Sequence, residues 1–326
     1  MFYFWGRKVL QYGLVLLITL LINFSLPRFM PGSPLELLAG EDVGRLNTEE
    51  REEIMARYGL DQPIPKQFVI YLGQLREGDL GYSYRQNRPV SEIIWERLPW
   101  TLLLTGSALI LSSLVGVVFG TLAAWRRGKF SDVGSLSLFI FLDSMPSFWL
   151  GMIMVALFGA RLRWFPVFGA RTPFADYTGW AAAVDILHHL ALPLATLTLV
   201  TIAGLFLIIR YSTLETMGEQ YITVARAKGL KERIIIFRHV LRNAMLPAIT
   251  VFMLSLGYIV SGTTVIETVF AWPGLGRLMF EAVMQRDYPV LQASFMVVTV
   301  CVIAANLIAD LLYPLVDPRV RIEGRH

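Results

Sequence analysis

The sequence has little charge and almost no cysteine. Only 17% of its 326 residues are charged, against 55% that are hydrophobic, and Cys301 is the one cysteine in the chain. A soluble domain carries about a quarter charged residues, so this composition excludes a soluble cytoplasmic enzyme. A single cysteine excludes an intrachain disulfide and a thiolate metal cluster.

The sequence also lacks the motifs of an enzyme that uses nucleotides. No G-x-x-x-x-G-K-[ST] phosphate loop occurs in it. The chain therefore has no Walker A site of its own, and energy for any active process comes from another subunit or from an ion gradient. No Ser/His/Asp or Cys/His group gathers on one side of the membrane, which disfavours a membrane enzyme. A surplus of 29 basic over 25 acidic residues is too small to indicate nucleic-acid binding.

The chain instead contains long apolar runs. Each has about 20 residues or more, enough at about 1.5 Å per residue to cross a hydrocarbon core of about 30 Å. Helices are the expected form, because lipid offers the backbone no hydrogen-bond partner. The predicted fold class is an all-α polytopic membrane protein with six transmembrane helices, at residues 9–30, 100–124, 134–159, 187–209, 246–266 and 289–313.

Basic residues in the short connections predict the orientation. Arg126, Arg127 and Lys129 fall on the same side as the basic segment 226–242. By the positive-inside rule that side is cytoplasmic, as are both termini. We expect an N-terminus and first helix at 1–30, an extracytoplasmic subdomain at 31–98, a five-helix core at 99–313 and a cytoplasmic tail at 314–326.

The predicted external subdomain contains two helix signals. Asn47 with Glu50 three residues later resembles a capping box. A second short helix begins near Pro65 and ends before Gly78. Its apolar face consists of Phe68, Tyr71, Leu72 and Leu75. Two interpretations stay open: a lid packed on the membrane domain, or a surface that receives a partner or shields a pore mouth.

The connection from 211 to 247 is too long for a simple turn between spans. Apolar residues at helical spacing predict a first helix, which Gly229 closes in the left-handed conformation. A second helix starts near Glu232 and is broken at Pro247. The apolar face of the first helix consists of Leu214, Met217, Tyr221 and Val224. Such a knob fits a partner's groove or lies on the membrane surface.

Several motifs together resemble a known family. The stretch Tyr221-Ile-Thr-Val-Ala-Arg-Ala-Lys-Gly-Leu230, followed by Arg238-His-Val-Leu-Arg-Asn-Ala-Met-Leu-Pro247, is similar to the EAA loop of ABC importer permeases, specifically the oligopeptide, dipeptide and nickel permease family. The chain resembles the first permease of the pair in such systems. Further motifs of the resemblance are Pro31-Gly-Ser-Pro34, Tyr58-Gly-Leu-Asp61, Gly78-Asp-Leu-Gly-Tyr-Ser83, Pro146-Ser-Phe148, Glu267–Gly276, Arg286-Asp-Tyr-Pro289 and Asp317-Pro-Arg319.

The resemblance implies a type I ABC importer permease fold that forms half of a translocation pore. The implied cargo is a di- or oligopeptide or a related small solute, with nickel and glutathione left open. The implied partners are a homologous second permease, two ABC ATPase subunits that bind ATP and Mg²⁺, and an extracytoplasmic substrate-binding protein. The chain would hold no cofactor, would not be an enzyme, and would lie in a bacterial or archaeal plasma (inner) membrane.

The resemblance also assigns a coupling loop that enters a cleft on the ATPase. Ala225 matches the second alanine of the family motif and Gly229 its glycine, whereas Thr223 and Val224 stand where the general motif has glutamate and its first alanine. The predicted coupling residues are Tyr221, Thr223, Ala225, Arg226, Ala227, Lys228, Gly229 and Leu230.

Two segments are candidates for a pore or gate. Asp143 is an ionisable residue inside an apolar run, where function is the default hypothesis; the alternative is a structural hydrogen bond at a kink imposed by Pro146. In a second functional hypothesis, Asp143 is the relay of a proton-coupled secondary transporter. The irregular segment after the fifth span is a plug or gate, or a plain re-entrant turn. The candidates are Asp143, Pro146, Glu267, Trp272, Pro273 and Gly274.

His188 and His189 invite a nickel-ligand interpretation. Adjacent residues of a helix point in different directions, and no carboxylate or cysteine joins these histidines at ligand spacing. We therefore expect helix-end residues here and no metal site.

Overall fold

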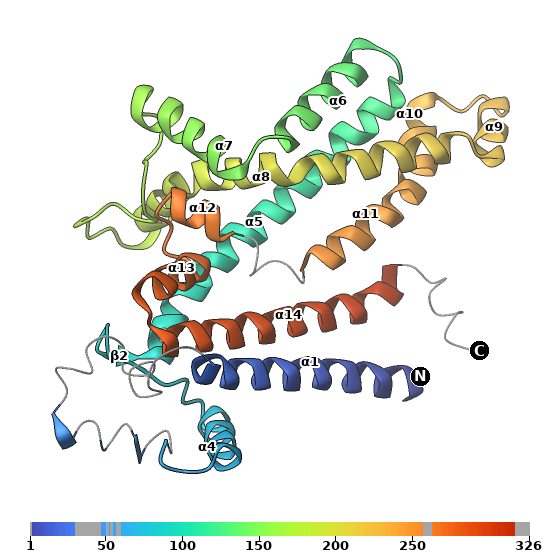
Figure 1. The fold of residues 1–326 in the computed structure, drawn as a ribbon. Helices are drawn as coiled ribbons and strands as arrows, with labels where there is room; N and C mark the ends of the chain where they lie inside the picture. Colours follow the sequence, from blue (N-terminus) through green and yellow to red (C-terminus); the bar gives the residue numbers. More distant parts are fainter. Residues whose placement is uncertain are drawn as a thin grey trace. The chain divides into compact units, whose positions relative to one another are not determined.

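The computed structural model describes residues 2–29, 47–49, 52, 55–56, 60–256 and 263–316. Its elements are mainly helices, with one short hairpin (Figure 1). In chain order they are α1 Phe2–Phe29, α4 Ile64–Arg76, β1 Tyr82–Ser83, β2 Arg88–Pro89, α5 Val90–Trp125, α6 Phe130–Asp143, α7 Ser147–Met154, π-helical η2 Val155–Arg161, α8 Gly179–Met217, α9 Gln220–Ala227, α10 Glu232–Ile234, π-helical η3 Ile235–Val240, α11 Leu241–Leu256, α12 Thr264–Val269, α13 Leu275–Gln285 and α14 Tyr288–Val316.

Within the described residues, five helical segments are long and apolar enough to cross a membrane, and the count reaches six if a bent pair is one span. The bent pair joins α6 to α7 with η2. The predicted fold class, an all-α polytopic membrane protein, is confirmed. The five segments are Gly6–Ser25, Val90–Trp125, Gly179–Met217, Glu232–Leu256 and Tyr288–Leu312.

The third predicted span, 134–159, is not one straight helix. α6 ends at Asp143, α7 starts at Ser147, and the two parts are bent by 103°. Pro146 lies in the break with φ −57° and ψ 133°, directly before α7. Proline disfavours helical geometry in the residue before it, so the first helix stops and a new one begins after it. The predicted kink at Pro146 is therefore confirmed, and it is a complete break.

The fifth predicted span, 246–266, is displaced along the chain. A continuous helical path runs from Glu232 through η3 to Leu256, and residues 257–262 lie outside the described part. The prediction that Pro247 breaks this helix is wrong, because Pro247 lies inside α11. Proline removes one backbone donor, and a membrane helix tolerates that loss where neighbouring helices support it. α11 has such support, since it packs along α8.

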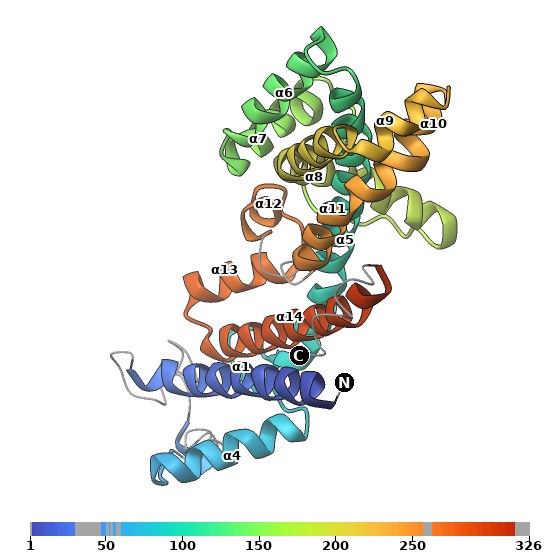
Figure 2. The ribbon, with the colours of Figure 1, turned by 90° about the vertical axis from the view of Figure 1, so that its right-hand side faces the viewer.

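The described chain divides into two compact units. The first contains residues 1–101 and 273–303, and within it α1 and α14 lie side by side (Figures 1 and 2). Asn23 donates a hydrogen bond to the backbone oxygen of Gln292, over 3.3 Å, and the Gln292 side chain donates to the backbone oxygen of Asn23. This reciprocal amide pair fixes the register of the two helices.

The predicted short external helix is present as α4, with Pro65 in its first turn. Its half-buried face packs on α1, because the rings of Phe68 and Tyr71 lie 5.0 and 5.8 Å from the ring of Phe24. Leu72 was predicted on this face and is instead exposed. At about 100° per residue the four predicted positions span an arc of about 100°, and Leu72 lies at one edge of it, where a side chain reaches solvent. The predicted capping box at Asn47 lies largely outside the described residues.

Two motifs that are distant in the sequence meet in the first unit. The Ser83 hydroxyl donates a 2.5 Å hydrogen bond to the Asp287 carboxylate, and the Arg85 guanidinium donates to the Gln285 carbonyl over 3.0 Å. Asp287 is buried, and this burial raises its carboxyl pKa above the ordinary value. The hairpin β1–β2 is thereby tied to the turn between α13 and α14.

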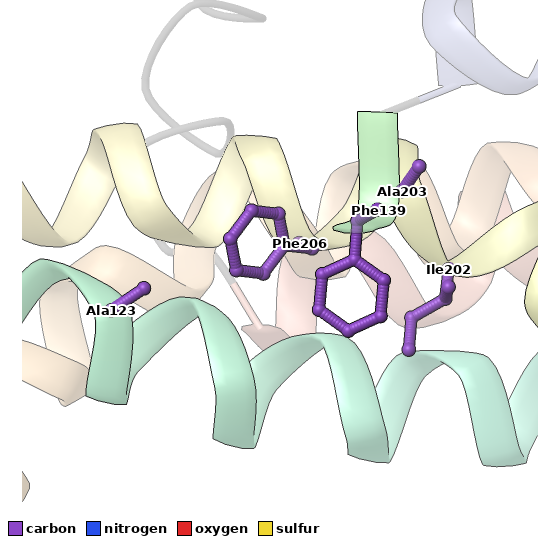
Figure 3. Packing of buried hydrophobic residues seen from close by; sticks show 5 residues of the cluster. All are labelled: Ala123, Phe139, Ile202, Ala203 and Phe206. Atoms are coloured by element: carbon purple, nitrogen blue, oxygen red, sulfur yellow. The ribbon is translucent and has the colours of Figure 1, made fainter. Parts of the chain in front are cut away.

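The second unit contains residues 102–272 and 304–326, with α8 at its centre. α5 crosses α8 closely because Gly116 and Gly120 have no side chains. A Cβ on Gly120 would lie 2.8 Å from the carbonyl oxygen of Phe206. Figure 3 shows Phe139 of α6 against Phe206, with the α8 residue Ile202 beside it; Ala123 and Ala203 complete this buried cluster. These contacts hold α5, α6 and α8 together.

Candidate functional site

The candidate coupling loop, residues 211–247, forms a compact helical knob that runs from the last turns of α8 to the first turns of α11. α8 ends at Met217, Gly218 follows as its C-cap, and α9 starts at Gln220 (Figure 1). The prediction of one apolar face through Leu214, Met217, Tyr221 and Val224 is therefore wrong. The break at Gly218 and Glu219 changes the helical phase, so residues before and after it do not share a face.

The knob has its own apolar core. Its buried members are Ile222, Ala225, Ile235, Ile236 and Val240. Trp125, the last residue of α5, and Met217, the last residue of α8, pack against this core. The Trp125 ring also meets the Phe237 ring edge-on, with centroids 6.4 Å apart. α8, which leads into the knob, and the end of α5 beside it are thus both fastened to the knob by side-chain packing.

A Schellman turn closes α9. The N–H of Leu230 bonds to the carbonyl of Ala225 over 3.4 Å, and the N–H of Gly229 bonds to that of Arg226 over 2.9 Å. Gly229 has φ +76°, the left-handed conformation that this turn requires. The prediction that Gly229 closes the helix is confirmed.

Seven of the eight predicted coupling residues are exposed on α9 and its closing turn, and Ala225 is buried. Ala225 thus serves the knob's internal packing, where a small side chain lets α9 approach η3 closely. Around the exposed residues lie large apolar side chains, and Arg226 forms an ion pair with Glu232 at 2.8 Å. Exposed apolar groups beside charged ones are typical of a docking surface. The exposed apolar residues are Tyr221, Val224, Leu230, Ile234 and Phe237.

The predicted gate residues fall in separate places. Asp143 and Pro146 lie at the break between α6 and α7, and both are exposed. Asp143 makes no side-chain hydrogen bond within the described residues, whereas the Ser144 hydroxyl donates to the Ile140 carbonyl over 2.8 Å. The structural hydrogen bond predicted for Asp143 at this kink is therefore not formed within the described residues, and the side chain that bonds there is that of Ser144.

Glu267 lies in the short helix α12 and Trp272 follows it; both side chains are fully buried, whereas Val265 and Thr268 of α12 are exposed. The Thr263 hydroxyl donates to the Glu267 carboxylate over 3.0 Å, and the Trp272 N–H donates to the Glu267 carbonyl over 2.8 Å. α12 packs on α7 at Gly151, where a Cβ would lie 3.2 Å from Val269. Pro273 follows, and Gly274 is the N-cap of α13. The segment is thus a packed helical turn.

A cavity of about 350 Å³ opens between α5, α8 and α11 in the second unit. This volume lies at the small end of the range for pockets that hold small molecules. The hydroxyls of Ser112, Thr201 and Ser255 each donate to a carbonyl of their own helix. Their oxygens keep free lone pairs, so this wall accepts hydrogen bonds. The polar members of the lining are Thr105, Ser112, Thr201, Ser255 and Thr263.

Sequence reasoning missed a buried ion pair beside the knob. Arg210 of α8 contacts Asp132 of α6 through two parallel hydrogen bonds, Nε to Oδ1 at 2.7 Å and Nη2 to Oδ2 at 3.0 Å. Asp132 is 2% exposed and Arg210 9%. One signal was available: Arg210 is a lone charge in the apolar run before Tyr211, and a charge there needs a partner.

His188 and His189 have different partners. A ring nitrogen of His188 lies 2.9 Å from the Trp164 carbonyl, and His189 is 3.4 Å from the Asp185 carboxylate. The expectation that no carboxylate approaches these histidines is therefore wrong for His189, because Asp185 lies one helical turn before it. Asp185 is also engaged by Thr172. Among the described residues, no group of three or more His, Cys, Asp or Glu side chains is placed to hold a metal.

Two protein-family profiles match this chain. The profile described as "Binding-protein-dependent transport system inner membrane component" matches residues 116–322, and its companion N-terminal profile matches residues 1–105. These two matches cover most of the chain.

Individual relatives align over nearly the full length. The oligopeptide transport system permease protein AppB of Bacillus subtilis is 38% identical over 96% of this chain and 98% of its own. The di/tripeptide transport system permease protein DppB of Pseudomonas aeruginosa is 36% identical over 92% and 93%. The dipeptide transport system permease protein DppB of Alkalihalophilus pseudofirmus is 35% identical over 97% and 98%.

These similarities give no support to the proton-coupled secondary transporter. They are to subunits of systems that depend on a binding protein, and such a system works with an ATPase and a substrate-binding protein. The chain therefore belongs to the family of binding-protein-dependent transport system inner membrane components and is a multi-pass permease subunit of an ABC importer.

Proposed function

We propose that this chain forms half of the translocation pore of an importer for di- or oligopeptides. The observation that carries the peptide assignment is the likeness over at least 92% of each chain to permeases named for oligopeptides and di/tripeptides. Those names favour peptides over nickel or glutathione as the cargo. The other half of the pore is a homologous second permease.

Energy comes from two ABC ATPase subunits, which bind ATP and Mg²⁺, and this chain hydrolyses nothing itself. The knob of residues 211–247 enters a cleft on one ATPase. Support for this role comes from the knob's buried core, its Schellman turn at Gly229 and the exposed apolar side chains around α9. A rigid knob transmits movement to α8 and α5, because Met217 and Trp125 pack on its core.

The chain lies in the plasma (inner) membrane with both termini in the cytoplasm. The basic residues around the knob favour a cytoplasmic position for it, by the positive-inside rule. Residues 31–98 then form an extracytoplasmic subdomain, 99–313 the core and 314–326 a cytoplasmic tail. A substrate-binding protein delivers peptides on the external side.

The cavity between α5, α8 and α11 is our candidate for part of the peptide's path. Its hydroxyl oxygens accept hydrogen bonds, and peptides offer N–H groups and an ammonium group as donors. Neutral acceptors bind such groups more weakly than a charged residue would, and with less dependence on the sequence of the peptide. A permease that carries varied peptides requires this weak, unselective binding. Of the predicted gate residues, Glu267 contacts this wall through the hydrogen bond that it accepts from Thr263.

Reconstitution tests the proposal. The chain is assembled with its partner permease and ATPases in vesicles, with the binding protein outside, and uptake of labelled dipeptides and oligopeptides is measured. We expect uptake that requires ATP on the ATPase side. Vesicles that hold the chain alone, with an imposed proton gradient and no ATP, are the control and should take up nothing. Uptake in that control, or uptake of nickel but of no peptide by the full complex, would refute the proposal.

A further inference from the structure

The buried pair of Asp132 and Arg210 is more elaborate than a simple ion pair. Besides the two guanidinium hydrogen bonds, Asp132 Oδ2 accepts the N–H of Gly128 over 2.9 Å. Gly128 has φ +75° and lies in the turn between α5 and α6. One carboxylate therefore joins three parts of the second unit: the first turn of α6, the turn that precedes it, and α8.

The pair fixes geometry more than it adds stability. A buried pair gives up the hydration of both ions, and two well-packed apolar residues often serve stability equally well. Loss of a single partner is different, because it leaves an uncompensated buried charge. The planar guanidinium against the carboxylate admits one relative orientation of α6 and α8, which apolar contact does not impose.

Arg210, and the Gly128 whose N–H bonds to Asp132, both lie close in the sequence to residues that pack on the coupling knob. Gly128 is three residues after Trp125, which packs on the knob's core. Arg210 is seven residues before Met217, two helical turns along the same face of α8, and Met217 packs on that core as well. Trp125 and Met217 hold the knob by packing on its core. The ion pair therefore joins α6 to α8 and to the turn after α5, the two parts of the chain that carry these residues.

The far end of α6 reaches the bend. α6 ends at Asp143, the 103° break follows, and α7 packs on α12 at Gly151. A displacement of α6 along α8 would therefore be carried to α7 and to α12, which holds the buried Glu267.

We propose that Asp132 and Arg210 are positioning residues that lock α6 to the knob, so that α6 and the bend at 144–146 move with the knob during transport. The inference rests on the proposed function, because it presumes that the knob receives the movement of the ATPase. Without the lock, α6 stays packed through Phe139 but is free to slip along α8. ATP hydrolysis would then continue with little transport.

Phe139 explains why variants of the pair should still fold. Its ring lies against that of Phe206 (Figure 3), with centroids 4.7 Å apart, and its centroid is 5.8 Å from that of Phe119. It therefore holds the C-terminal half of α6 independently of the ion pair. Loss of the lock should therefore loosen the register of α6 without detaching it.

The test uses the reconstituted complex and measures peptide uptake, ATP hydrolysis and the melting temperature. Arg210→Lys keeps the charge but loses the two-pronged geometry. The double variant Asp132→Leu/Arg210→Met removes both charges and restores an apolar contact. Arg88→Lys is the matched control, because Arg88 grips Glu96 through two hydrogen bonds on the surface of the first unit.

We expect transport per ATP to fall about tenfold in Arg210→Lys and in the double variant, with hydrolysis within about twofold of wild type, since coupling energies of this kind are worth about 5- to 150-fold. The double variant should melt near the wild-type temperature, and Arg88→Lys should match wild type in every readout. A double variant that transports as much per ATP as wild type would overturn the inference, even if Arg210→Lys fails to fold. If the wild-type complex shows no ATP-dependent uptake, the proposed function fails instead.

Discussion

Gly229 is the position where one backbone angle decides whether α9 closes into the turn that ends it. Its φ of +76° lies in the left-handed region, and a Cβ built on it would meet nothing within 4 Å. A substitution there would therefore clash with no neighbour. Its whole cost would come from local backbone strain, which makes the size of the effect calculable.

The left-handed conformation costs about 1–2 kcal/mol for an L-residue with a side chain. Asn pays less, and a β-branched residue pays more. A cost of one or two kcal/mol changes the ratio of closed to open turn by about 5- to 30-fold. The core around Ile222 and Ile235 is untouched, so folding should stay largely intact. We expect transport per ATP to fall in the order Gly229, Gly229→Asn, Gly229→Ala, Gly229→Val.

The assay compares peptide uptake and ATP hydrolysis for these variants in the assembled complex. Gly134→Ala on α6 is the matched control, because its Cβ would also meet open space and its φ is not positive. Gly134→Ala should behave as wild type. Unchanged coupling in Gly229→Val would refute the docking role of the turn. Equal loss in Gly229→Asn and Gly229→Val would refute the strain argument.

Three further outcomes follow from the packing and burial. Gly120→Ala should destabilise by about 1–3 kcal/mol, because its Cβ would lie 2.8 Å from the α8 backbone, whereas Gly106→Ala on the same helix meets open space and should melt at or above the wild-type temperature. Ile222→Ala should cost about 2–5 kcal/mol within the knob and speed limited proteolysis there, whereas Val224→Ala, at a side chain that is 52% exposed, should not. Burial raises the Asp287 pKa above 3.8 in the folded protein, so its protonated form is favoured by folding; this stability is complete below pH 3.8 and is lost as pH rises through the raised value. Asp287→Asn should flatten that part of the melting temperature's pH profile, and an unchanged slope would show that another group titrates.

The spans could be predicted from sequence because hydropathy reports contact with lipid directly. Their ends could not, because hydropathy does not report where a helix stops. α5 starts at Val90, ten residues before the apolar run at 100, and its first turns carry charged residues such as Glu92 and Glu96. α8 likewise continues for 39 residues, well beyond the apolar run 187–209. A helix that leaves the membrane keeps its backbone hydrogen bonds, and only its side chains change.

In the knob, the sequence was sufficient for the turn but not for the buried face. Gly229 was identifiable because few other residues adopt a positive φ at low cost. The buried face was assigned to Tyr221 and Val224, but it consists of Ile222 and Ala225. Both pairs have the same spacing of three residues. The face is decided by η3 and by the break at Gly218, neither of which leaves a trace in the local periodicity.

The ion pair of Asp132 and Arg210 shows a different limit. Its members are 78 residues apart, so no local pattern connects them. Sequence alone says that a charge at position 210 needs a partner, and several acidic residues qualify. The partner is decided by the crossing of α6 and α8, which depends on the packing of Phe139 and Phe206. Long-range pairs of this kind require the fold first.

The prolines complete the contrast between local propensity and tertiary support. Pro99, Pro193 and Pro247 each lie inside a described helix, whereas Pro146 stands at a 103° break. The four residues have the same ring and the same missing donor, so the residue type cannot decide the outcome. Pro193 is buried in the central helix α8. Pro247 is exposed, but Ala244 and Ala248 on either side of it are buried and α11 packs along α8, so neighbours hold both helices on course. Pro146 is exposed and none of residues 143–149 is buried, so no packing holds the chain in a helix on either side of it. A proline in an apolar run therefore breaks the helix where packing does not oppose it, which makes the bend between α6 and α7 the natural place for this unit to flex.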